Sequence, residues 1–181
     1  MAEELIIKCC APTLAGLKIG SIFCLDKNYN GEDMKKCVEI LRKKGLAVRG
    51  VRGYKGQRLI YVYRPKGLRS VLNDRCNECI LRQIGYPSVS ETEAVSFLLN
   101  RIATQRDFPH EIGLFLGYPT DDVKGYIENQ GRNFILSGMW KVYCNEEQAR
   151  KCFANYKKCT AVYMNCYKNG TGLERLTVKC S

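Results

Sequence analysis

The chain has 181 residues, of which 45% are hydrophobic and 26% charged, a composition typical of a folded globular protein and unlike that of a disordered one. Its formal net charge is +11, and residues 34–75 carry all of the excess, with thirteen Lys or Arg against two acids. No apolar run approaches the roughly 20 residues that cross a bilayer, and the first residues lack the pattern of a secretion signal, so we expect a cytoplasmic protein with reduced thiols.

The first half of the chain predicts a strand, helix, strand, strand unit. Residues 31–44 have apolar side chains at helical spacing, acids in the first turn and Gly45 at the end, which together predict a helix. Strands are expected at 18–25, 46–52 and 58–63, the last two joined as a β-hairpin. The 58–63 strand is apolar on both sides, which favours an inner position in the sheet.

Beyond the hairpin the pattern becomes mainly helical. Residues 68–84 predict one or two short helices, and Ser90 with Glu93 forms the capping-box pattern of another. Short helices are then expected from Pro109 and from Thr120. In the second of these, Asp121 and Asp122 are interpreted as charges that open the helix.

Two further elements are expected near the C-terminus. Residues 133–144 are rich in aromatic and β-branched side chains and predict a strand. Asn145 has the position of a cap for a long helix over 146–168. The pattern as a whole predicts an α+β fold, with a small mixed sheet of about four strands covered by helices and a long C-terminal helix. We expect one domain over 1–181, with two possible sub-lobes, a basic α/β part at 1–86 and a mainly helical part at 87–181.

The eleven cysteines are expected to be mostly structural. Cys152, Cys159 and Cys166 recur every seven residues, which places them on one helix face about 10 Å apart, too far for any pair to form a disulfide. We interpret them as small core side chains. Cys76 and Cys79 form the one C-x-x-C motif, a weak candidate for metal or redox chemistry, because neither a second pair nor a preceding strand accompanies it. No metal is therefore predicted, and no cofactor can be assigned.

The basic hairpin is the most specific feature of the sequence. Arg49, Arg52, Lys55 and Arg58 are expected to cluster at its tip around Tyr54. This arrangement predicts docking of an acidic macromolecule, most simply an acidic protein. An alternative is nucleic-acid binding, with cations on phosphates and the tyrosine on a base. A basic face that is merely solvated is the third possibility.

A separate hypothesis of function, an enzyme or ligand pocket, concerns the one histidine, His110. Cys10 lies beside Pro12, which predicts a turn, whereas His110 and Glu111 lie at a helix start. If these segments meet, the thiol and the imidazole form the one nucleophile and base pair that the chain can assemble. The sequence then predicts a small thiol-dependent enzyme or a ligand pocket around Cys10, His110 and Glu111.

Several segments together resemble a known family. They are residues 10–18, 59–65, 108–119, 122–127 and 138–143. The chain is similar along nearly its whole length to an uncharacterised family of anaerobic Firmicutes, catalogued as domain of unknown function 3793. The resemblance implies neither an activity nor a cofactor. If members of this family are encoded near flavodoxins, the resemblance implies docking to an acidic, flavodoxin-like redox protein.

Overall fold

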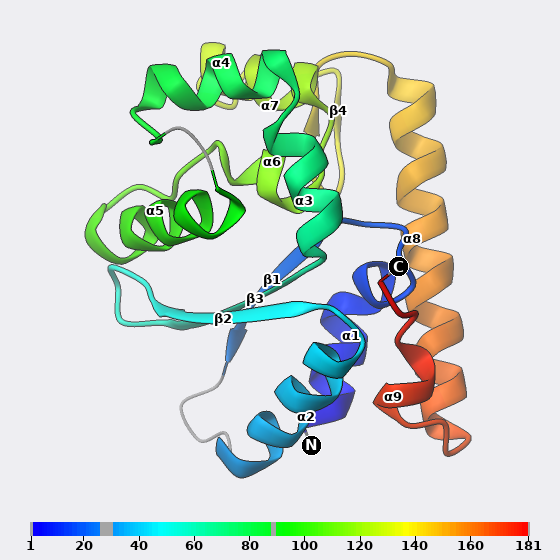
Figure 1. Ribbon diagram of the computed structural model, residues 1–181. Coiled ribbons are helices and arrows are strands. Elements are labelled where there is room, and N and C mark those ends of the chain that lie inside the picture. The colour runs from blue at the N-terminus through cyan, green and yellow to red at the C-terminus, as the bar shows by residue number, and fades with distance from the viewer. Residues whose placement is uncertain (1, 26–30, 88–89, 181) are drawn as a thin grey trace.

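The computed structural model describes residues 2–25, 31–87 and 90–180. At its centre lies an antiparallel sheet with strand order β1-β3-β2 (Figure 1). The strands are β1 (Gly20–Leu25), β2 (Ala47–Arg52) and β3 (Arg58–Tyr63). The predicted inner position of β3 is confirmed, because β3 pairs with both other strands. Its apolar residues on both sides therefore face protein and not water.

Alternation along β3 divides the core into two parts. Leu59, Tyr61 and Tyr63 belong to a cluster with the helices on one face of the sheet. Val62, together with the half-buried Ile60, belongs to a second cluster on the other face. Because successive side chains of a strand point to opposite faces, the sheet separates two hydrophobic cores.

Two groups of helices cover these two faces (Figure 1). One face carries α1 (Ala2–Leu14), α2 (Gly31–Lys43) and the short α9 (Leu173–Leu176). The other face carries α3 (Pro65–Leu72), α4 (Arg75–Ile84), α5 (Glu91–Thr104), α6 (Ile112–Leu116) and α7 (Thr120–Glu128). The capping box predicted at Ser90 and Glu93 is present at the start of α5.

The predicted long helix is α8 (Glu146–Lys168), which Asn145 caps through its side chain. It runs beside the sheet from one end of the molecule to the other (Figure 1). Its first half packs Ala149 and Phe153 against the hairpin of β4 (Leu136–Ser137) and β5 (Lys141–Val142), whereas its second half packs against α1. No helix within the described ranges is long and apolar enough to cross a membrane.

The α+β class is thus confirmed, but three details differ from the expectation. The sheet is antiparallel throughout rather than mixed, and its three strands exclude the expected fourth. Residues 133–144 instead contain the separate β4–β5 hairpin, in which the chain reverses over residues 138–140 between two short strands. The expected turn at Pro12 lies within α1, where Ile6, Ile7 and Leu14 bury one helix face.

The cysteines of α8 are in keeping with a structural role. Cys152, Cys159 and Cys166 are half-buried, and Cys166 packs against the core that α1 and α2 share. Burial raises the pKa of the Cys159 thiol. The deepest side chains of this helix are Ala149, Phe153 and Tyr156, so the aromatic residues of the stripe contribute more of its buried surface than the thiols.

Arg64, one of the thirteen basic residues, is an internal connector. Its guanidinium donates to the carbonyl oxygens of Thr13 (2.7 Å), Leu14 (2.7 Å) and Val178 (2.8 Å) and to the thiol of Cys180 (3.0 Å). It therefore satisfies carbonyls at the C-terminal end of α1, where a positive charge is also favourable.

We expect the Arg64→Lys variant to lose about 2 kcal/mol of unfolding free energy, because a single ammonium cannot reach three carbonyls that the planar guanidinium spans. Urea unfolding measures the effect. Arg69→Lys, at an exposed position on α3, is the matched control and should leave stability unchanged. Equal stability of the two variants would contradict the connecting role of Arg64.

Candidate functional site

A cavity of about 360 Å³ lies between the loop before α6, helix α7 and the β4–β5 hairpin. Five aromatic rings contribute to its wall. They belong to Phe108, His110, Tyr118, Tyr126 and Trp140. The segments 108–119, 122–127 and 138–143, which carry much of the family resemblance, therefore come together around one cavity.

Asp122 holds the cavity wall in place. Its Oδ2 accepts the indole N–H of Trp140 (2.7 Å), and its Oδ1 accepts the backbone N–H groups of Tyr143 (2.7 Å) and Cys144 (3.2 Å). The side chain is 3% exposed. Because both oxygens are occupied, the carboxylate fixes the β4–β5 hairpin on α7, and its role is more specific than the helix-opening charge that the sequence suggested.

The rings are packed against one another in a fixed order. Trp140 stacks on Tyr118 with ring centroids 4.7 Å apart, and Phe153 meets Trp140 edge-on at 4.5 Å. The ammonium of Lys18 lies 5.2 Å from the centroid of the Tyr118 ring. Burial lowers the pKa of Lys18 to about 8. These contacts limit the motion of the Trp140 ring, so the indole acts as a rigid wall of the cavity.

Two side chains that carry N–H groups, Lys141 and His110, line the cavity. The Lys141 ammonium donates to the Gly131 carbonyl (2.6 Å) and lies near the rings of Tyr126 (5.7 Å) and Phe134 (4.7 Å). It has two further N–H groups, since an ammonium has three. His110 is exposed and rests on Tyr126, with ring centroids 4.8 Å apart. Among the described residues, no hydrogen bond holds the His110 imidazole.

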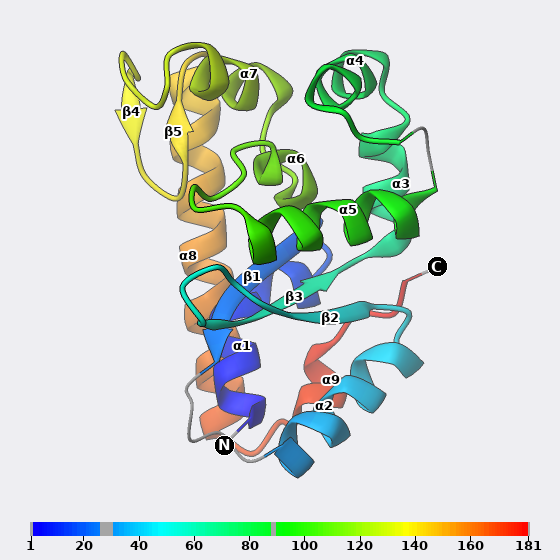
Figure 2. The ribbon, with the colours of Figure 1, turned by 90° about the vertical axis from the view of Figure 1, so that its left-hand side faces the viewer.

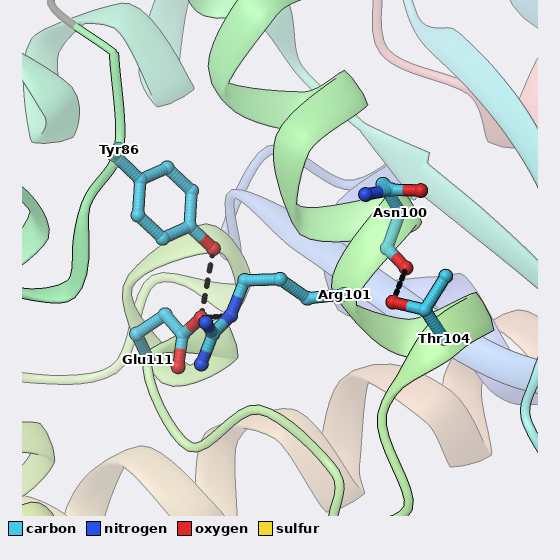
Figure 3. Close-up of polar contacts among 5 residues, drawn as sticks. All are labelled: Tyr86, Asn100, Arg101, Thr104 and Glu111. Atoms are coloured by element: carbon cyan, nitrogen blue, oxygen red, sulfur yellow. Dashed lines mark hydrogen bonds and ion pairs between the residues drawn. The ribbon is translucent and has the colours of Figure 1, made fainter.

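Glu111 turns away from His110 into the core. It is 2% exposed, and its Oε1 lies 2.7 Å from Arg101 Nε and accepts the Tyr86 hydroxyl at 2.9 Å (Figure 3). The Arg101 N–H is not aligned with this oxygen, so the contact is an ion pair without a good hydrogen bond. Burial and the carboxylate raise the pKa of Tyr86 well above its ordinary value. Glu111 is thus committed to a structural network that joins α5, α6 and the residues after α4.

Cys10 and His110 do not meet. Cys10 is fully buried in α1 in the core on one face of the sheet, whereas Ile112 and Leu114 to Leu116, shortly after His110, belong to the core on the other face. Burial raises the pKa of the Cys10 thiol far above its ordinary value. His110 lines the aromatic cavity, whose lining in the described part of the chain does not include Cys10. The arrangement gives no support to a Cys10 nucleophile with His110 as its base.

The hairpin tip is also arranged differently from the expected cluster. Arg52 and Arg58 lie opposite each other at the ends of β2 and β3. Arg49 pairs with Tyr61 and, because strand residues alternate, projects from the opposite face, where a hydrogen bond links it to Tyr63. Tyr54 is 57% exposed. Only part of the predicted basic cluster is therefore available at one surface.

A groove lies between this tip and the chain after α5, and it shares one lining residue with the aromatic cavity. Tyr54, Lys55 and Arg106 line the groove together with Phe108, and Phe108 also lines the cavity. The Tyr54 N–H donates to the Ile102 carbonyl (3.1 Å), which fixes the tip against the end of α5. In Figure 2 the β2–β3 loop, the chain after α5 and the β4–β5 hairpin lie on the same side of the molecule.

The C-x-x-C motif lies on helix α4. Cys76 and Cys79 are both exposed, and the amide of Gln83 lies 3.8 Å from the Cys79 sulfur. Within the described part of the chain, no group of three or more His, Cys, Asp or Glu side chains is arranged to hold a metal ion. The position of the motif does not favour a metal centre over two surface thiols.

These features define a small α+β protein with helices on both faces of an antiparallel sheet and an aromatic cavity beside it. The chain matches the model of the family described as protein of unknown function (DUF3793) over residues 6–177, and it belongs to that family. The resemblance seen in the sequence is thereby confirmed. Neither a curated protein nor a solved structure matches the chain.

Proposed function

We propose that this protein binds an acidic protein through a surface that joins the hairpin tip to the rim of the aromatic cavity, here called the docking surface. We assign to it Lys55 and Arg106 of the groove, Arg52 and Arg58 at the strand ends beside the tip, and the exposed apolar residues Tyr54, Phe108, Phe134, Ile135 and Met139. The observation that carries the proposal is the position of Phe108, which lines both the groove and the cavity.

The composition of this surface supports a partner of opposite charge. Lys55 and Arg106 line the groove together with one acid, Asp107, and Arg52 and Arg58 lie at the strand ends next to the tip. Exposed apolar side chains in a group, beside charges, are typical of protein interaction sites. A cationic rim would attract an acidic partner over distance, and the apolar side chains would hold it after contact. A flavodoxin-like redox protein, which the family resemblance suggested, has the required charge.

A protein partner is favoured over nucleic acid by the side chains present. Ile135 is 53% exposed and Met139 is 41% exposed, and these side chains can pack against a protein but cannot stack on a base as the exposed rings of Tyr54 and Phe108 could. Trp140, the one tryptophan, is packed against Tyr118 and Phe153 in the cavity wall rather than presented at the hairpin tip. Nucleic-acid binding through Arg49, Arg52, Tyr54, Lys55 and Arg58 is the alternative, and it loses support because Arg49 lies on the other face.

The test is titration with a purified acidic flavodoxin, and separately with single-stranded DNA and RNA, at several salt concentrations. We expect the double variant Lys55→Glu, Arg58→Glu to weaken flavodoxin binding about tenfold or more at low salt, mainly through slower association. Lys157→Glu with Lys158→Glu, an equal change of charge on the exposed side of α8, is the control. An equal loss in both double variants, or binding of nucleic acid alone, would reject the proposal.

A further inference from the structure

The aromatic cavity has the form of a small-molecule site in its own right. Its volume of about 360 Å³ is sufficient for a compound of one or two rings, since ligand pockets begin at roughly 300 Å³. Its lining combines flat aromatic walls with a small number of polar groups. Such a combination is typical of a site that orients a planar apolar ligand by one polar end.

The polar groups of the lining that are still free to bind a ligand determine which charge the polar end of that ligand should carry. Asp122 is the one acid in the lining, and hydrogen bonds to Trp140, Tyr143 and Cys144 occupy both of its oxygens. Lys141 retains two N–H groups, and the His110 imidazole is exposed beside Tyr126. A ligand therefore meets unused donors and no unused carboxylate, which favours an anionic group over a cationic one.

From these observations we infer that the cavity binds planar aromatic carboxylates, with the rings between the aromatic walls and the carboxylate at Lys141. The inference goes beyond the docking of a protein and does not depend on it. Lys141 also lies where its hydrogen bond to the Gly131 carbonyl and the ring of Tyr126 limit its motion. The ammonium is therefore already positioned before a ligand arrives, which lowers the entropy cost of binding.

The probe is 2-naphthoate, compared by calorimetry with the uncharged 2-naphthamide and the cationic 2-naphthylmethylamine. We expect the naphthoate to bind about tenfold more tightly than the amide, as one charge-assisted hydrogen bond provides. Because the chain has one tryptophan, the indole N–H resonance in an NMR spectrum reports on Trp140 without further assignment. Binding in the cavity should shift this resonance.

Three variants test the placement. Lys141→Gln should reduce naphthoate affinity to that of the amide, whereas Lys124→Gln on the outer side of α7 should change neither affinity. His110→Ala removes an exposed part of the cavity wall without disturbing the core, and it should weaken the binding of both naphthoate and naphthamide severalfold. Tighter binding of the amide or amine, an unmoved Trp140 resonance, or unchanged binding in His110→Ala would overturn the inference.

The result is separable from the docking proposal. Lys55→Glu with Arg58→Glu, at the hairpin tip outside the cavity lining, should leave naphthoate binding unchanged. If flavodoxin binding fails while naphthoate binding follows Lys141, the docking proposal is rejected and the ligand site stands. The reverse pattern rejects the ligand site alone.

Discussion

Replacement of Glu111 by glutamine is expected to lower the free energy of unfolding by about 3 kcal/mol, because it leaves the partly buried guanidinium of Arg101 without a counter-charge. Glu111 is 2% exposed and the Arg101 side chain 22% exposed, so little water is present to replace the carboxylate. The amide oxygen of glutamine can still accept a hydrogen bond from the Tyr86 hydroxyl. The loss of unfolding free energy therefore reports the contribution of the ion pair alone. Urea unfolding with a two-state analysis measures it.

Glu78→Gln is the matched control for this variant. Glu78 pairs with Arg82 one helical turn away at 2.6 Å, but the two side chains are 43% and 63% exposed. Removal of such a surface pair costs about 0.5 kcal/mol or less, since water solvates both charges after the change. A Glu111→Gln protein as stable as Glu78→Gln would show that the buried network contributes nothing to the fold.

The second large effect is expected at Asp122. In the Asp122→Asn variant one oxygen is replaced by an NH₂ group, which opposes either the Trp140 indole N–H or the backbone N–H groups of Tyr143 and Cys144. At least one buried donor then loses its acceptor, and the charge that strengthens the remaining bonds is lost. We expect a loss of about 3 kcal/mol, together with a changed near-UV circular dichroism signal from Trp140.

Asp121→Asn provides the comparison at the neighbouring position. Asp121 is exposed in the first turn of α7, where its charge contributes by interaction with the helix dipole, about 0.3–1 kcal/mol. Its replacement should leave the Trp140 signal unchanged. If both variants lose equal stability, or if Asp122→Asn retains the native Trp140 signal, the proposed clamp on the β4–β5 hairpin is wrong.

Local sequence patterns were sufficient for the elements whose signals lie within a few residues. The helix now seen as α2, the β2–β3 hairpin, the capping box at Ser90 and the cap at Asn145 were all predicted, because apolar spacing and side-chain caps act over one or two turns. The inner position of β3 was also predictable from its apolar residues on both sides.

The sequence patterns predicted the wrong structure where aromatic side chains line the cavity. Residues 133–144 have strand-like composition, but Trp140 is placed by Tyr118 and Asp122, and the chain forms only a short hairpin there. Pro12 was expected to mark a turn, although the buried helix face on both sides of it keeps α1 continuous to Leu14. In both cases tertiary packing outweighs a local preference.

By itself, the sequence determined the charge of this protein, its class of fold and the residues that can carry chemistry. Which of those residues meet was decided by the tertiary structure alone. The sheet separates Cys10 from the chain that follows His110 because alternate strand residues face opposite cores, and the same alternation removes Arg49 from the tip. Asp122, Trp140 and Lys141 come from elements that no short-range pattern connects, so their common cavity follows only from the way α7 and the β4–β5 hairpin pack together.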